Sequence, residues 1–314
     1  MGPEFLIDLS VFRQAAQDVL AGLNPYAREG FFTPPWGLYL FLPLVPWPEP
    51  IAQGLWFLLN LGLFLRCLRL MAVGSAAPRA WVVALMLGPL VWPYAYFGNL
   101  LGLVFLGLLG LWRWRRSWLA LPLVLLKPQL VFIPLALWLI RRGPGEVMRG
   151  VLFLLLLNLP LWVIRPSLYS DFVTSSLGQR YVETQALHIV ALSNIASLGS
   201  SAWYAVAAVL GLAFLSIALW RREERTTWLT ALLADPLASG GEYAALAVVG
   251  ARSYQPWPRL LWPALIFLGM PLLGLFLPEG AWLYPLSALA YLVYHLFRRQ
   301  RDSSPSLDKP STPS

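Results

Sequence analysis

The sequence predicts an all-α polytopic membrane protein, and three observations support this fold class. Of the 314 residues, 58% are hydrophobic and only 12% are charged, which is too apolar for a soluble domain of this length. The apolar residues form long blocks that end in arginine clusters, and they do not alternate as the strands of a β-barrel would. We expect a bundle of about 9–12 transmembrane or re-entrant helices around a cavity that faces outward.

The excess of basic residues reflects membrane topology rather than nucleic-acid binding. The net charge is +8, but the basic residues lie in short clusters at helix ends instead of on one folded face. The one cysteine, Cys67, cannot form an internal disulfide, and His188 and His295 are the only histidines. We therefore expect no metal site and no cofactor.

Residues 1–34 are expected to form an external N-terminal segment that contains a helix at 10–22. Ser10 is a suitable N-cap, and Gly22 is a suitable residue to end the helix. This helix is amphipathic, so we expect it to lie in the membrane interface. Its apolar side holds Val11, Phe12, Ala15, Ala16, Val19, Leu20 and Leu23, and its polar side holds Arg13, Gln14, Gln17 and Asp18.

The transmembrane domain is expected at 35–298, followed by a disordered cytoplasmic tail at 299–314. Within this domain the long polar stretch 165–200 should be an external loop. Segment 36–48 either spans the membrane simply or kinks at a proline, and charge alone does not decide between these alternatives. Hydropathy marks apolar segments at 36–48, 51–73, 80–97, 99–112, 118–140, 148–164, 202–220, 227–250, 258–277 and 281–297.

Arginine clusters set the expected orientation, because the cytoplasmic ends of membrane helices carry an excess of basic residues. If every cluster is cytoplasmic, segments 118–140 and 227–250 must leave and re-enter on the same side. Their halves, which meet at "LLKPQL" and "ADPLASGGEY", are too short to span ~30 Å of hydrocarbon. Broken helices of this kind are tolerated where they line a polar cavity. The clusters are Arg66, Arg69 and Arg79; Arg113, Arg115 and Arg116; Arg141, Arg142 and Arg149; Arg221, Arg222 and Arg225; Arg252 and Arg259; and Arg298, Arg299 and Arg301.

This topology collects the unusual polar groups on the outer side, where ionisable residues at membrane depth are functional candidates. Lys127 interrupts an apolar run, and it is either a snorkelling lysine at a helix end or a point charge for a phosphate. Asp8 either serves a helix N-terminus or takes part in chemistry. Arg180 is a second candidate phosphate contact in an otherwise solvated loop. The remaining candidates for a substrate cavity are Asn24, Tyr26, Asn99, Gln129, His188, Asn194, Asp235, Glu242 and Tyr243.

Four stretches within residues 7–142 occur in an order that resembles a known family. They are "IDLSVFRQAAQDVLAGLNPY", "FFTPPWGLYLFLPL", "FGNLLGLVFL" and "LLKPQLVFIPLALWLIRR". Together they resemble glycosyltransferase family 87, also called DUF2029, which belongs to the GT-C class of membrane enzymes. A weaker similarity continues through "ADPLASGGEYAALAVV". The family often has Gly-Gln where this chain has Gly98-Asn99. It also carries a transmembrane helix before the aspartate that matches Asp8, so we expect such a helix upstream.

The resemblance implies a GT-C-like bundle in the bacterial plasma membrane, with its active site facing outside. It implies a hexosyltransferase that moves a hexose, with mannose expected, from a polyprenyl-phosphate carrier to a hydroxyl of a glycolipid or glycan acceptor. Asp8 matches the position of the family's catalytic base. Lys127 and Arg180 would hold the departing phosphate while a single displacement inverts the anomeric centre. Asp235 and Glu242 are alternative acids.

Two other function classes fit parts of the sequence. A transporter or flippase of a lipid-linked or small polar substrate would also place broken helices at a polar cavity, but it predicts pseudo-symmetric halves that the sequence does not show. A non-catalytic membrane scaffold would have no use for a lysine at membrane depth. The residues and the resemblance together favour the enzyme.

Overall fold

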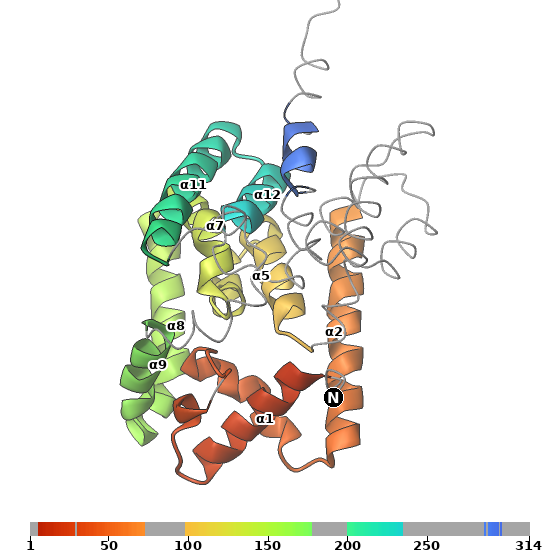
Figure 1. The fold of residues 1–314 in the computed structure, drawn as a ribbon, viewed down its shortest axis with the longest axis vertical. Helices are drawn as coiled ribbons and strands as arrows, with labels where there is room; N and C mark the ends of the chain where they lie inside the picture. The colour runs from red at the N-terminus through yellow and green to blue at the C-terminus, as the bar shows by residue number, and fades with distance from the viewer. Residues whose placement is uncertain are drawn as a thin grey trace, which may run out of the picture.

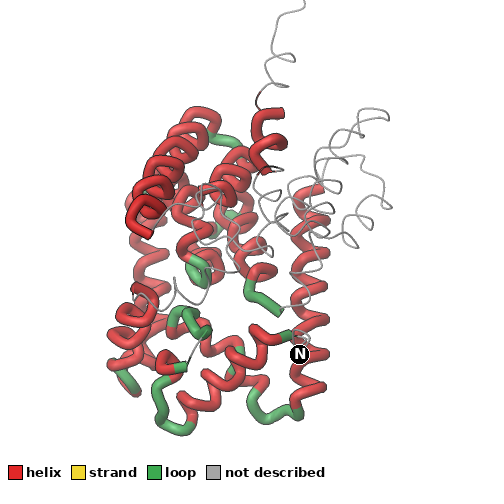
Figure 2. The backbone as a smooth tube through the Cα atoms, viewed as in Figure 1, coloured by secondary structure: helices red, strands yellow, loops and turns green. Residues whose placement is uncertain are grey.

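The computed structural model describes residues 6–28, 30–72, 98–177 and 200–234, together with residues 286, 288–294 and 296 of a helix near the C-terminus. Every regular element in these ranges is a helix, as Figure 2 shows. The prediction of an all-α fold is therefore confirmed for the part of the chain that the structure describes. The elements are α1 Ile7–Leu20, η1 Pro25–Ala27, η2 Pro35–Leu40, η3 Leu42–Leu44, α2 Glu49–Ala72, α5 Leu101–Arg113, η4 Ser117–Ala120, α6 Leu121–Val124, α7 Pro128–Arg141, α8 Pro144–Ile164, α9 Ser167–Leu177, α11 Ser200–Arg221 and α12 Glu224–Ala234.

The helices form two levels (Figure 1). We call α1, the short 3-10 helices η1, η2 and η3, and α9 the basal layer; it lies at the lower end of the view. The bundle of α5, α6, α7, α8, α11 and α12 stands above it, and α2 runs along one side of both levels. The basal layer comes from the N-terminal stretch and from α9, which begins at Ser167. After α8 the chain therefore returns to the level at which it began.

Helix α1 begins earlier than the sequence suggested. Leu6 adopts a left-handed conformation with φ 58° at the N-cap position, and the backbone N–H of Ser10 donates to the Leu6 carbonyl at 3.2 Å. The assignment of Ser10 as the N-cap is therefore wrong. The side chain of Leu6 is fully buried, and this burial fixes the start of the helix one turn before Ser10. As a result Asp8 lies in the first turn, where the helix dipole favours an acid.

The C-terminal end of α1 was predicted correctly. Gly22 has φ 75°, its N–H donates to the Val19 carbonyl at 3.1 Å, and the N–H of Leu23 donates to the Asp18 carbonyl at 2.7 Å. These two hydrogen bonds form a Schellman motif, which needs a residue that tolerates positive φ.

The apolar side of α1 packs on its own chain. Phe12, Ala15 and Ala16 are buried, and the Phe12 ring stacks on Phe41 with centroids 4.7 Å apart. In contrast, Leu20 is 65% exposed, because the end of α1 extends beyond this contact. Packing within the basal layer therefore explains most of the amphipathic pattern, and the apolar C-terminal end of α1 is what remains for a contact with lipid.

Segment 36–48 does not form a spanning helix. It folds as the short 3-10 helices η2 and η3, with Pro35 as the first residue of η2 and Pro43 as the second residue of η3. Prolines lack the N–H that a continuous α-helix needs, so the kinked alternative is correct. The side chain of Arg13 holds this segment in place, because its guanidinium donates to the carbonyl oxygens of Leu44 at 3.2 Å and of Val45 at 3.2 Å.

The predicted break in segment 118–140 is confirmed. η4 and α6 run along α5, the chain turns at Lys127-Pro128, and α7 returns along α5. A Cβ at Gly107 would lie 2.9 Å from the backbone nitrogen of Val124, and at the other end the Arg141 guanidinium lies 4.2 Å from the centre of the Trp112 ring. The chain thus comes back to the end at which it left. The 14 residues of α7 extend ~21 Å, less than the hydrocarbon thickness.

The arginine clusters in the described residues meet at the upper end of the bundle. Arg113 forms an ion pair with Glu224 at 2.7 Å and also donates to the Leu70 carbonyl. Arg141 donates to the Arg222 carbonyl. These contacts join the ends of α2, α5, α7, α11 and α12, as expected if the clusters share one side of a membrane.

Two helices are long and apolar enough to cross a membrane by length and composition, Glu49–Leu70 and Pro144–Ile164. Only 11% of the apolar window of the second is buried within the protein, whereas the core helix of a soluble protein would be mostly covered. This exposure supports membrane association. The apolar helices α5, Leu101–Arg113, and α7, Pro128–Arg141, are shorter than a span.

The rest of the predicted domain plan is covered in part. The first third of the expected external loop 165–200 is not a loop, because Ser167–Leu177 form helix α9. Its side chains pack on η1 and α8, and Tyr169 donates to the side chain of Asn158 at 2.7 Å. Outside the described residues lie 80–97, 178–199 of the expected loop, 235–250, 258–277, about half of 281–297 and the tail 299–314.

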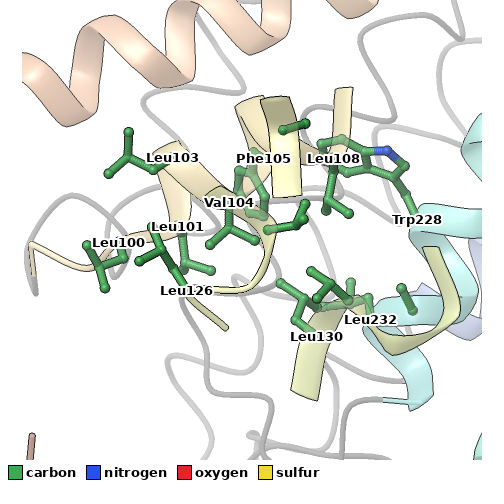
Figure 3. Packing of buried hydrophobic residues seen from close by; sticks show 14 of the residues in the cluster. Leu100, Leu101, Leu103, Val104, Phe105, Leu108, Leu126, Leu130, Trp228 and Leu232 are labelled. Carbon is green, nitrogen blue, oxygen red and sulfur yellow. The ribbon is translucent and has the colours of Figure 1, made fainter. Parts of the chain in front are cut away.

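We call η4, α6, the turn at Lys127-Pro128 and α7 the hairpin. The core lies where α5 meets this hairpin and α12 (Figure 3). The Phe105 ring contacts Trp228 of α12 with centroids 5.5 Å apart. Leucines supply most of the remaining contacts. Each Å² of apolar surface that they bury stabilises the fold by ~25 cal/mol. The residues labelled in the view are Leu100, Leu101, Leu103, Val104, Phe105, Leu108, Leu126, Leu130, Trp228 and Leu232.

We predict that Gly107→Ala destabilises the protein by about 1–3 kcal/mol, because the added methyl group meets backbone atoms of α6. Thermal unfolding in detergent should show a lower Tm. Gly62→Ala in α2 is the matched control, since a Cβ there meets nothing within 4 Å and alanine favours a helix by about 1 kcal/mol. Equal Tm values for the two variants would contradict the close packing of the hairpin on α5.

Candidate functional site

Asp8 is half-buried and lies on the side of α1 that packs against the protein. It precedes Phe12 and Ala15 by one and two helical turns, so it shares the side of α1 that is buried. The side-chain N–H of Asn99 donates to the Asp8 carboxylate oxygen Oδ2 at 3.0 Å, across 91 residues of sequence. The structure therefore brings two of the predicted site residues together, one from α1 and one from the loop before α5.

The loop at 98–100 is held in place from both sides. Gly98 has φ 70°, and a Cβ there would lie 2.7 Å from the side chain of Leu6. The indole N–H of Trp56, which is 2% exposed, donates to the Gly98 carbonyl at 2.6 Å. α1 and α2 thus clamp the backbone that carries Asn99. Trp56 was missed in the sequence, although an indole N–H within an apolar block always needs an acceptor.

One polar atom of this site is unsatisfied among the described residues. The Asn99 oxygen Oδ1 is buried and accepts no hydrogen bond there, while the amide nitrogen donates to Asp8. Buried amide oxygens are almost always paired with a donor. Among the described residues, the Asn99 amide therefore keeps an unused acceptor beside the Asp8 carboxylate.

Lys127 lies at the tip of the hairpin, directly before α7. Its neighbour Leu126 lies 3.2 Å from the Cβ that Gly37 of η2 would carry, and the Trp36 indole N–H donates to the Pro122 carbonyl at 3.1 Å. The tip of the hairpin therefore rests on η2, which also packs on α1. Asp8, Asn99 and Lys127 come from three segments that meet where the basal layer joins the bundle.

Asn24 and Tyr26 brace a turn of the basal layer. The Asn24 side chain accepts from the backbone N–H of Tyr26 at 2.9 Å, and the Tyr26 hydroxyl donates to the Thr33 carbonyl at 2.8 Å. The Tyr26 ring is buried between Phe31 and Phe172, with centroid distances of 5.2 and 5.6 Å. Burial raises the pKa of Tyr26 above its ordinary value, and the nearby Tyr169 and Asp171 add to this effect.

The remaining predicted residues cannot be placed beside Asp8. Gln129 belongs to the first turn of α7. The other candidates lie outside the described residues, and their roles stay predictions: Arg180, His188, Asn194, Asp235, Glu242 and Tyr243. Within the described ranges, no group of three or more His, Cys, Asp or Glu residues is placed to hold a metal ion.

A polar groove of about 160 Å³ lies on the other side of α1, between this helix and the start of α2. Arg13, Gln17 and Gln53 are among its lining residues. Helical spacing places Arg13 and Gln17 roughly opposite Asp8. The groove is therefore separate from the Asp8–Asn99 contact, and it faces the surface of the basal layer.

A further ion pair in the basal layer was missed in the sequence. The Arg28 guanidinium donates to both carboxylate oxygens of Asp18 at 2.8–3.0 Å, and its Nη1 atom donates to the side-chain oxygen of Gln14 at 2.8 Å. The pair closes the turn after α1. Asp18 is therefore committed to a structural contact, and Asp8 is the acid of α1 that faces the core.

Comparison with known proteins adds no assignment, because no family model, no curated protein and no solved structure matches this chain.

We predict that Tyr26→Phe flattens the loss of stability at alkaline pH. The raised pKa means that the phenol stabilises the fold fully below pH 10, the ordinary pKa, and that this contribution is lost as the pH rises above 10. Phenylalanine has no proton to lose. At neutral pH the variant should be about 1 kcal/mol less stable, since it lacks the hydrogen bond to Thr33.

Thermal unfolding measured from neutral to strongly alkaline pH tests this expectation. The Tm of the unmodified protein should fall more steeply above pH 10 than that of the variant. Parallel profiles would show that the Tyr26 phenol is not buried as the structure places it.

Proposed function

We propose that this protein is a membrane glycosyltransferase that moves a hexose from a polyprenyl-phosphate carrier to a hydroxyl of a glycolipid or glycan acceptor. The single observation that supports it best is the contact between Asp8 and Asn99 at 3.0 Å. This contact joins the first and third of the four family-like stretches. A carboxylate on the apolar side of a helix is costly to bury, so its retention there favours a function.

Asp8 would act as the general base. Its carboxylate accepts the proton of the acceptor hydroxyl while the hydroxyl oxygen attacks the anomeric carbon. The bond between that carbon and the phosphate oxygen breaks, polyprenyl phosphate leaves with the electron pair, and the anomeric centre inverts. Asn99 would be a positioning residue, because its amide fixes the carboxylate through Oδ2.

Lys127 would hold the departing phosphate, with Arg180 as a second contact. Lys127 directly precedes α7, so the positive end of this helix dipole lies beside it. A lysine and a helix N-terminus at one point offer an anion both a charge and a dipole. The hairpin tip rests on η2, which also packs on α1, and this arrangement supports a common site with Asp8.

The broken hairpin of α6 and α7 also favours a transporter or flippase as a second candidate. The two functions differ in what happens to the sugar. A transferase forms a new glycosidic bond, whereas a transporter returns the substrate unchanged on the other side of the membrane.

We predict that Asp8→Asn lowers sugar transfer by about 10²–10⁴-fold, the range that general-base help supplies. The measurement is transfer of radiolabelled hexose from polyprenyl phosphate to acceptors in a membrane extract, with the full chain purified into lipid. Asp18→Asn is the matched control on the same helix, since Asp18 pairs with Arg28 instead of facing the core. It should retain transfer within about threefold.

Wild-type transfer by a folded Asp8→Asn variant would overturn the role of Asp8 and move the base to Asp235 or Glu242. If neither protein forms a glycosidic bond with any donor while labelled lipid crosses the bilayer, the transporter is the correct class.

We predict that Lys127→Gln weakens inhibition by free polyprenyl phosphate and lowers kcat/KM for the donor by roughly 10–100-fold, which corresponds to about 1.4–2.8 kcal/mol. The KM for the acceptor should not change, because the lysine is assigned to the phosphate alone. Lys127→Arg keeps the charge and should recover part of the loss. A change confined to the acceptor KM would contradict the assignment.

A further inference from the structure

A second cavity lies between the C-terminal halves of α5 and α7. Figure 1 shows that these helix ends lie at the end of the bundle away from the basal layer. Its volume is about 250 Å³. Among the described residues it is lined by Leu111, Trp112, Pro134, Trp138, Arg141 and Arg142. The lining thus combines apolar and aromatic walls with two arginines that are adjacent in sequence, at the end where the arginine clusters gather.

The walls of this cavity are fixed by contacts within the protein. The Trp138 indole N–H donates to the Ser117 hydroxyl at 2.9 Å, and the ring is 4% exposed. The Arg141 guanidinium lies over the Trp112 ring at 4.2 Å and donates to the Arg222 carbonyl. A cavity with preset walls loses little conformational entropy when a ligand binds.

The cavity carries an excess of positive charge in the described part of the chain. Arg141 and Arg142 are adjacent, and Arg222 approaches Arg141 through its carbonyl. Of the described acids nearby, Glu224 pairs with Arg113 at 2.7 Å and Glu146 pairs with Arg149 at 3.5 Å. Glu223 follows Arg222 in the sequence and is not among the lining residues. Two arginines with no carboxylate among the lining residues favour an anion, and phosphate suits the fork geometry of a guanidinium group.

The position of the cavity indicates what carries the phosphate. Free phosphate would gain only from the arginines, whereas the lining also includes Leu111, Pro134 and two tryptophans. Tryptophan side chains gather at the level of lipid headgroups, and basic pockets between helices on the cytoplasmic side suit anionic headgroups. We propose that this cavity binds the phosphate headgroup of an anionic phospholipid. The proposal does not depend on the proposed transferase activity.

The test uses the full chain, purified in a neutral detergent and freed of lipid. Short-chain phosphatidylglycerol, phosphatidylcholine of the same chain length and inorganic phosphate are titrated separately, and both the Tm and the lipid adducts in native mass spectrometry are recorded. Phosphatidylglycerol should raise the Tm and remain bound, with at least tenfold higher affinity than phosphatidylcholine. Equal binding of the two lipids would overturn the proposal.

The variant Arg142→Gln locates the site. It should weaken phosphatidylglycerol binding by about tenfold, a typical loss for one charged hydrogen-bonding partner. Arg115→Gln is the matched control, since Arg115 is exposed and belongs to the neighbouring cluster but does not line the cavity. Equal weakening by both variants would assign the effect to general surface charge and overturn the site.

Inorganic phosphate distinguishes the source of the anion. It should neither raise the Tm at millimolar concentration nor displace the lipid. If it does both, and if Arg142→Gln abolishes the effect, the cavity is a site for free phosphate and the lipid assignment is wrong. Arg142→Lys serves as a second variant that keeps the charge, and it should show intermediate lipid binding because the planar fork is lost.

Discussion

The close approach of η4 and α6 to α5 is the constraint on which the rest of the bundle depends. Gly107 and Gly110 present no side chain to the neighbouring segment, and a Cβ at either would lie within 3.0 Å of its atoms. Small residues of this kind allow close packing where no hydrophobic effect drives two helices together. Because the first half of the hairpin lies against α5, its tip reaches η2 and its second half returns to the arginine-rich end.

The basal layer packs against the tip of this hairpin. η2 rests on the tip, α1 packs on η2 and η3 through Phe12, and the loop at Gly98 is clamped between Leu6 and Trp56. The contact between Asp8 and Asn99 is the consequence of this stacking. The helix dipole alone would explain an acid in the first turn of α1, but it would not require that the acid face the core or meet an amide from another segment.

Features set by local chemistry could be predicted from the sequence. The glycine at position 22 ends α1 because only a residue that tolerates positive φ closes the Schellman motif. The break at Lys127-Pro128 follows from the proline and from the arginines on both sides of the segment. Both predictions depend on a few neighbouring residues, so no knowledge of the tertiary structure was needed.

Features set by tertiary contacts could not be predicted. The start of α1 depends on the burial of Leu6, which overrides the polar cap that Ser10 offered. Tyr26 resembled a cavity residue because a polar tip in an apolar segment fits either role, and only the position of the Thr33 carbonyl distinguishes them. The order of the four family-like stretches indicated a family resemblance, but the contact between Asp8 and Asn99 became visible only when the loop at Asn99 was placed in space.

The basic residues at the two ends of α7 differ in their electrostatic setting. Arg141 and Arg142 follow the C-terminal end, where cations stabilise the negative end of the helix dipole. Lys127 precedes the N-terminal end, where a cation meets the positive end of the same dipole and is unfavourable by roughly 0.3–1 kcal/mol. A helix that needed only stability would carry an acid there. An anion beside both the lysine and the helix N-terminus interacts favourably with each of them, and a departing phosphate would be such an anion.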